Sequence, residues 1–321
     1  MITDRPGNRK RDELDQSIPA ADTPLSYRVY APKRPVMARQ EGTLMLKDIV
    51  VHIPVDRPAE PVTDCALSVA AMFGAHLDGV VCAYETINPA IAVGPSAAAF
   101  ALPTEYNTDP QRANNQLDQF VATAQRAGID CGRGCVSDSP FRANRALAEL
   151  SRLYDLAIVL QRDSARPTHD GALPEAVLFS AGRPMLLVPY IHSGPMKTDR
   201  ALICWDGSSQ AARALHDALP FLERAQAIDV VTVNDSDSTG NENSAANLLV
   251  HLARRGLPAK LQQATAEPSN IHNVILSLAA DLGSDFLVMG GYGHSRLREV
   301  VLGGVSRGML QSLTIPALIS H

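Results

Sequence analysis

The residues of this sequence that could do chemistry through their backbone are glycines gathered near its C-terminus. The set comprises Gly290, Gly291, Gly293, Gly303 and Gly304. The first three follow the apolar run FLVM, which is typical of a buried strand, and the last two precede VSRGMLQSL, whose apolar residues recur every four positions as in a helix. A glycine lacks a Cβ, so its amide can approach an oxygen atom closely. Because a helix N-terminus also presents unpaired N–H groups, the cluster predicts a site for an anion such as phosphate.

The spacing of these glycines distinguishes them from the common phosphate-binding loops. Gly290, Gly293 and Gly303 form G-x2-G-x9-G, which is neither G-x-G-x-x-G nor G-x4-G-K-[ST]. No lysine follows the glycines, so a phosphate at this place would be held mainly by backbone amides. The alternative is that the glycines form only tight turns at strand ends.

A carboxylate follows a second apolar run, in ICWDGS (203–208). In open α/β sheets ligands lie beyond the carboxyl ends of the strands, so Asp206 could contact the polar part of a ligand. The segment 210–225 has the pattern of an amphipathic helix, with Ser208 or Ser209 as its N-cap. The alternative is that Asp206 only caps this helix.

The elements that would position these residues occur twice along the chain. The matching strands are 45–55 with 200–209, 78–84 with 228–235, 154–160 with 284–290, and 183–189 with 315–321. The matching helices are 65–76 with 210–225, and 141–153 with 269–283. Such an alternation repeated in one chain indicates an internal repeat, parallel sheets and right-handed crossovers. The sequence therefore predicts an α/β fold with two tandem, doubly wound parallel-sheet domains.

We place the first domain at residues 45–192 and the second at 197–321. Residues 1–44 show neither a helical nor a strand period and are expected to form a disordered tail. Residues 85–108 have no counterpart in the second half and are interpreted as a surface loop, with a cover or an oligomer contact as the alternatives.

Composition excludes several classes of function. The net charge of −5 indicates neither a nucleic-acid surface nor a polybasic membrane patch, and no apolar run is long enough to span a bilayer. The N-terminus has no apolar signal region, and five cysteines, an odd count, favour reduced thiols in the cytoplasm. The pair Cys131 and Cys135 lacks a nearby histidine or second cysteine pair, so no structural metal is expected. No nucleophile motif is present either.

With these residues in place, the chain resembles the universal stress protein family, as a tandem member with two such domains. The family's nucleotide signature is G-x2-G-x9-G followed by Ser or Thr, which Gly290, Gly293 and Gly303 match, and ICWDGS resembles the end of its first strand. Gly304 stands where the family has the hydroxyl residue. Since a hydrogen bond to a charged group contributes about 1.5–3 kcal/mol, this departure could weaken ATP binding about tenfold or more.

The resemblance implies a role for each candidate residue. Asp206 should contact the ribose or adenine, Thr232 or Val233 should line the adenine pocket with Met289 nearby, and amides from Gly293 and from Gly303, Gly304 and Val305 should meet the phosphates of ATP. Single-domain members pair their terminal strands across a dimer. The segments 183–189 and 315–321 should therefore pair inside this chain, as a pseudo-twofold contact between domains.

The first half departs from the nucleotide signature. Aligning the two halves places Leu160 opposite Gly290, Gln161 opposite Gly291 and Asp163 opposite Gly293. A leucine blocks close approach of the backbone and an aspartate repels phosphate. We therefore predict that the first half has no nucleotide site.

These observations predict a non-enzymatic stress or regulatory protein that binds an adenine nucleotide in its second half, hydrolyses it at most slowly, and has a protein partner that the sequence does not identify. One alternative is a nucleotide-independent protein-interaction module. Another is an enzyme that uses an adenine nucleotide, but CWDGSSQ lacks the Ser-Gly-Gly-x-Asp-Ser type of loop that such enzymes need.

Overall fold

A computed structural model of the chain describes residues 46–84, 108–234, 245–291 and 304–321. The expected tail, the expected loop at 85–107, and the glycines at 293 and 303 lie outside the described residues. The two described residues that flank 85–107 are bonded to each other, since the Thr108 amide donates to the Tyr84 carbonyl and the Tyr84 amide donates to the Thr108 hydroxyl, both at 3.0 Å.

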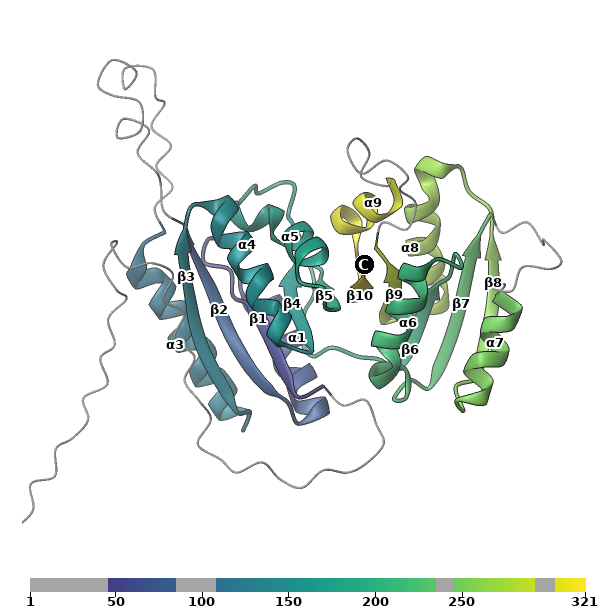
Figure 1. The fold of residues 1–321 in the computed structure, drawn as a ribbon, viewed down its shortest axis with the longest axis horizontal. Helices are drawn as coiled ribbons and strands as arrows, with labels where there is room; N and C mark the ends of the chain where they lie inside the picture. Colours follow the sequence, from purple (N-terminus) through teal and green to yellow (C-terminus); the bar gives the residue numbers. More distant parts are fainter. Residues whose placement is uncertain (1–45, 85–107, 235–244, 292–303) are drawn as a thin grey trace, which may run out of the picture.

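Ten described strands form a single sheet with helices on both faces (Figure 1). The strands are β1 (Asp48–His52), β2 (His76–Tyr84), β3 (Cys131–Asp138), β4 (Leu156–Leu160), β5 (Met185–Val188), β6 (Arg200–Cys204), β7 (Ala227–Val233), β8 (Ala259–Ala264), β9 (Phe286–Gly290) and β10 (Ala317–Ser320). The helices are α1 (Glu60–Phe73), α3 (Pro110–Arg126), α4 (Pro140–Leu150), α5 (Leu173–Ser180), α6 (Ser209–Leu222), α7 (Ala245–Arg254), α8 (Ile271–Leu282) and α9 (Gly304–Ser312).

The order of strands repeats between the halves of the sheet. It runs β3-β2-β1-β4-β5-β10-β9-β6-β7-β8, so each half has the same order when read from its outer edge to the centre. All neighbours within a half are parallel. Ile49 of β1 lies opposite Leu156 of β4, and Ala201 of β6 lies opposite Phe286 of β9 in the same register. The predicted α/β fold with parallel strands is confirmed.

The two halves of the sheet also share a hydrogen-bonding pattern made by an aspartate side chain. Asp155, just before β4, accepts hydrogen bonds from two amides at the start of β1, at 2.7 and 3.1 Å. Asp285, just before β9, accepts from two amides at the start of β6, at 3.2 and 3.0 Å. Each aspartate ties the first strand of its half to the fourth. The amino ends of those two strands are therefore held together in the same way in both halves.

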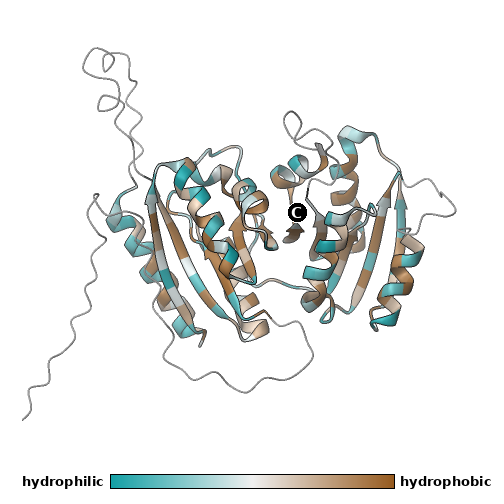
Figure 2. Ribbon diagram, in the orientation of Figure 1, coloured by the Kyte–Doolittle hydropathy of each residue, from teal (hydrophilic) through white to brown (hydrophobic). Residues whose placement is uncertain are grey.

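The hydrophobic core lies on both faces of the sheet. One buried cluster lies between the strands and α1, α3, α6 and α7, and the other lies between the strands and α4, α5, α8 and α9. Figure 2 shows hydrophobic residues concentrated in the strands and hydrophilic residues along the helices. None of the helices in the described ranges combines the length and the apolar character that crossing a bilayer requires.

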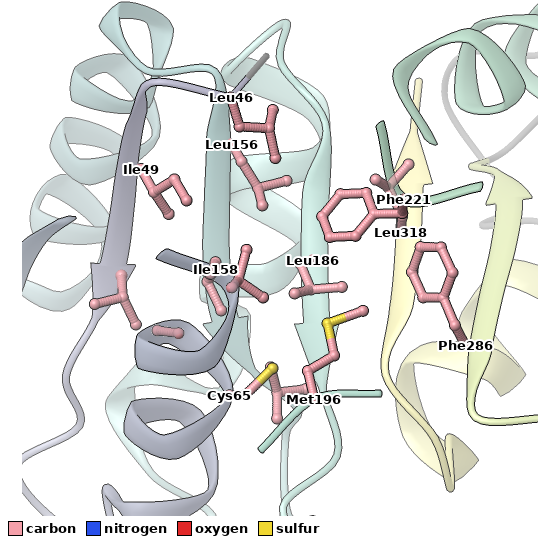
Figure 3. Packing of buried hydrophobic residues seen from close by; sticks show 14 of the residues in the cluster. Leu46, Ile49, Cys65, Leu156, Ile158, Leu186, Met196, Phe221, Phe286 and Leu318 are labelled. Atoms are coloured by element: carbon pink, nitrogen blue, oxygen red, sulfur yellow. The ribbon is translucent and has the colours of Figure 1, made fainter. Parts of the chain in front are cut away.

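The halves meet at β5 and β10, which pair antiparallel. Leu318 lies opposite Leu186 there, and both are fully buried, so the two terminal strands pair inside the chain as their matching sequences led us to expect. Figure 3 shows both leucines beside Phe221 of α6. The Phe221 ring packs edge-on against Phe73 of α1, with 5.0 Å between centroids, and its other neighbour is Phe286 of β9 at 5.2 Å. One continuous core therefore spans the junction.

Candidate functional site

The candidate site lies at the carboxyl edge of β6, β7 and β9. β6 is the neighbour of both other strands, so residues that follow the three strands come together in space. The Trp205 amide donates to the Val231 carbonyl at 2.9 Å and holds the end of β6 against β7. Asp206 begins the turn into α6 immediately after this point.

Asp206 is exposed at this edge and shapes the turn that precedes α6. Its Oδ1 accepts a hydrogen bond from the Ser208 amide at 3.0 Å. The Ser208 hydroxyl in turn accepts from the Ala211 amide at 3.1 Å, which makes Ser208 the N-cap that the sequence left open between two serines. Ser208, and not Asp206, therefore caps α6, and Asp206 stabilises the turn before the cap while its side chain stays exposed at the edge of the sheet.

The candidate residues divide between the faces of the sheet. Met289 belongs to the cluster beneath α8 and α9, and Val233 and Val305 pack against that cluster. Side chains alternate along a strand, so Thr232 points to the opposite face, toward α6 and α7. Its hydroxyl is buried and has no hydrogen-bond partner among the described residues. The structure thus separates Thr232 and Val233, which the sequence offered as equal candidates, and places Val233 on the side of Met289.

Gly290 has a packing role that its sequence position did not reveal. A Cβ at this position would lie 2.6 Å from the Ala211 nitrogen and 2.7 Å from the Gln210 carbonyl carbon. The absent side chain would therefore collide with the first turn of α6. Gly290 permits β9 to end directly against this helix, whether or not a ligand is present.

Gly291 is likewise used in packing and pairing. A Cβ there would lie 3.1 Å from Leu178 of α5, which belongs to the first half of the sheet. Its amide donates to the Ser320 carbonyl at 2.8 Å, and its carbonyl lies 2.9 Å from Nδ1 of the His321 ring. The start of the glycine segment is therefore fixed against the junction between the halves.

The helix that should meet phosphates begins at Gly304. Figure 1 shows α9, in yellow, above β9 and β10. Met309 in this helix and Leu313 just after it are buried and Val305 is half-buried, on the face that their spacing predicted. Ser306, in its first turn, is buried as well.

Asn234 is a residue of this edge that sequence reasoning missed. It follows Val233 directly and has a φ of 58°, in the left-handed region where asparagine is among the few tolerated residues. Its Oδ1 accepts from the Ala266 amide at 2.9 Å, and its Nδ2 donates to the Ala266 carbonyl at 2.7 Å. Asn234 thereby fixes the end of β7 to the segment after β8. The polar VND turn after an apolar run was the available signal.

The equivalent edge of the first half is filled by a buried ion pair. β4 ends at Leu160 as β9 ends at Gly290, which agrees with the alignment made from the sequence. Nη2 of Arg57 lies 2.8 Å from Oδ2 of Asp170, and the guanidinium also donates to the carbonyls of Leu160 and Gln161. Sequence reasoning did not identify this pair.

Asp163 was expected to repel phosphate in the first half. Its Oδ1 accepts from the Ala165 amide at 2.9 Å, in a local turn like that of Asp206, and the expected repulsion of phosphate stays a prediction. The buried pair of Arg57 and Asp170 is a second feature of this edge that opposes a ligand.

Within the described ranges, no group of three histidine, cysteine or acidic residues is arranged to hold a metal ion. All five cysteines lie in those ranges, and none of them forms a disulfide.

Comparison with known proteins relates the second half to a family of sequences. The model of the universal stress protein family matches residues 197–321. Universal stress protein Slr1230 of Synechocystis is 26% identical over 223 residues, which cover 67% of this chain and 74% of that protein.

Solved structures extend the likeness across the whole sheet. A universal stress protein from Archaeoglobus fulgidus superposes with a TM-score of 0.61 at 15% identity, covering 84% of this chain and 95% of its own. A functionally unknown protein from Pseudomonas aeruginosa gives a TM-score of 0.56 at 15% identity, with 86% and 92% covered. At this identity the likeness concerns the fold.

Proposed function

We propose that the chain is a member of the universal stress protein family, whose model matches its second half, residues 197–321, and that this half binds one adenine nucleotide, ATP. The protein would act as a non-enzymatic, nucleotide-binding component of a stress response. Binding is proposed for this half only, because the equivalent edge of the first half is filled by Arg57 and Asp170.

The observation that carries the proposal is that a carboxylate, apolar side chains and a helix N-terminus follow neighbouring strands at the carboxyl edge of the second half. Asp206 supplies an exposed carboxylate that can accept hydrogen bonds from ribose hydroxyls. Val233 and Met289 lie on the same face and supply apolar contact for a base. The N-terminus of α9, from Gly304, presents amides and the positive end of a helix dipole to phosphates. These three features suit the three parts of a nucleotide.

The same residues favour binding of a nucleotide over catalysis of its hydrolysis. The carboxylate of Asp206 already accepts a hydrogen bond from the Ser208 amide, and the other participants are apolar side chains and backbone amides. We therefore propose that any hydrolysis of ATP is slow. The protein partner and the cytoplasmic location remain predictions from the sequence.

A nucleotide-independent interaction module is the second candidate, and the packing of the glycines favours it. Gly290 is required by its close contact with the backbone of α6, and Gly291 is tightly packed against the Leu178 side chain of α5; both contacts would hold without any ligand. Mass spectrometry of the purified protein separates the two candidates, because an adenine nucleotide should be released on denaturation under the first and none under the second.

We expect Asp206→Asn to weaken ATP binding about tenfold or more, because a hydrogen bond to a charged group contributes about 1.5–3 kcal/mol. The asparagine Oδ1 can still accept from the Ser208 amide, so the turn and the thermal stability should be retained. Calorimetric titration with ATP measures the affinity.

Asp163→Asn is the matched control, since Asp163 makes the same kind of turn in the first half through the Ala165 amide. Its affinity for ATP should equal that of the wild type. If Asp206→Asn also bound ATP as the wild type does, Asp206 would be only a turn residue and this assignment would fail.

A further inference from the structure

A charged cluster is buried at the carboxyl edge of the first half. Asp170 belongs to a short 3-10 helix, His169–Ala172, that leads directly into α5. Its Oδ2 accepts from Nε of Arg57 at 2.9 Å and lies 2.8 Å from Nη2, and its Oδ1 accepts from the Thr168 hydroxyl. Arg57 is 8% exposed and Asp170 is 4% exposed. A cation and a hydroxyl thus converge on one carboxylate.

The cluster occupies the position that the candidate nucleotide site has in the second half. Arg57 lies in the connection from β1 to α1, as Asp206 lies in the connection from β6 to α6. Asp170 lies between β4 and α5, and the corresponding connection of the second half runs between β9 and α9. The Arg57 guanidinium also donates to the carbonyl of Leu160, the last residue of β4, at 3.3 Å.

Further buried polar atoms at the carboxyl ends of β1 and β4 lack partners among the described residues. Nδ1 of His52 and both side-chain heteroatoms of Gln161 have no hydrogen-bond partner among the described residues. His52 is 2% exposed and Gln161 is fully buried. Nδ1 of His52 lies 4.0 Å from Oδ2 of Asp170. Burial lowers the pKa of His52 to about 4, so the ring is neutral at pH 7 and able to donate a hydrogen bond without adding charge.

The charge state of the carboxylate agrees with its surroundings. Burial acts to raise the pKa of Asp170, yet the charges and hydrogen-bond donors around it lower that pKa overall. Asp170 is therefore an anion held in a cradle of donors, which is the condition of a bound oxyanion.

We propose that this edge of the first half is an oxyanion-binding cradle whose occupant is the chain's own Asp170 carboxylate. The carboxylate takes the place that a small soluble oxyanion would otherwise take, and Arg57 is its main counter-charge. The carboxyl edge of the first half is thereby occupied without a ligand. The second half is the one whose edge can bind a nucleotide. An ion pair with a structural role alone would show the same distances, but a free oxyanion would not bind in place of its carboxylate.

Chemical rescue tests the proposal on the full chain. Asp170→Ala removes the carboxylate and leaves space for formate, which is the same group as a free ion. The unfolding temperature of Asp170→Ala should fall below that of the wild type, and sodium formate should recover part of the loss relative to sodium chloride at equal ionic strength. The wild type should not gain in this way, because its cradle is filled.

Two further variants make the result specific. Asp170→Asn keeps the volume of the side chain and should not respond to formate, since no space is opened. The double variant Arg57→Leu with Asp170→Ala lacks the counter-charge and should not respond either. If Asp170→Ala does not fold in chloride, refolding in formate should restore native protein.

The proposal is overturned if formate neither raises the unfolding temperature of Asp170→Ala nor restores its folding, or if the double variant gains as much as the single one. The result is independent of nucleotide binding in the second half. A chain that failed to bind ATP could still show formate rescue, so the two claims can fail separately.

Discussion

Replacing Leu318 by aspartate should open the sheet at its centre and unfold the protein under conditions in which the wild type is native. Leu318 is fully buried, lies opposite the equally buried Leu186, and shares its cluster with Phe221. Loss of a buried leucine costs roughly 2–5 kcal/mol, and the buried carboxylate adds a desolvation cost to this. The total should approach the roughly 5–15 kcal/mol by which domains are stable. Urea denaturation followed by circular dichroism measures it.

Val250→Asp is the matched control, because Val250 is 49% exposed on α7. A substitution at such a surface position should change stability by no more than about 0.5 kcal/mol. An unfolding midpoint of Leu318→Asp equal to that of the control would mean that the junction carries little of the stability. Two separate transitions would mean that the halves fold independently.

Gly290→Leu should destabilise the fold strongly and abolish ATP binding as a consequence. Even a Cβ at this position would lie 2.6 Å from a backbone nitrogen of α6, so neither side chain rearrangement nor a rotamer change can relieve the contact. Forcing atoms into a packed site costs typically about 1–3 kcal/mol and more when backbone must move. The collision is with the backbone of α6, so it would occur with or without a ligand. Thermal unfolding and ATP titration of the same sample measure both effects.

Gly171→Ala provides the comparison, because a Cβ there would lie 3.6 Å from the Arg162 side chain, an ordinary contact. It should unfold close to the wild-type temperature. A Gly290→Leu chain that unfolded at the wild-type temperature but did not bind ATP would contradict the packing role. Gly290 would then be needed for the close approach of the ligand.

Much of the fold could be predicted because the central strands are buried on both faces. Runs such as LAIVL in β4 are continuously apolar, and every residue of that strand is buried. The outer strands β3 and β8 were not located, because edge strands are half-solvated and their sequences, CGRGCVSD and AKLQQA, contain no such run. The repeat itself was visible because both halves keep the same order of elements.

The candidate site could be predicted only in part. A pattern of glycines indicates that another group approaches the backbone closely, but it does not identify that group as a ligand or as a neighbouring helix. The structure assigns Gly290 to the packing against α6, and a phosphate contact at the start of α9 stays a prediction. Arg57 and Asp170 are 113 residues apart in the sequence, and neither lies in a recognisable motif, so their pairing was visible only in three dimensions. Alternation along β7 decided between Thr232 and Val233 once the faces of the sheet were known.

Calorimetric titration of the wild-type chain with ATP tests the central claim most directly, because it counts sites as well as measuring affinity. The account predicts one ATP per chain, with binding weakened by Asp206→Asn and unchanged by Asp163→Asn. Two ATP per chain would contradict the closure of the first half by Arg57 and Asp170, and no binding at millimolar ATP would contradict the nucleotide site itself.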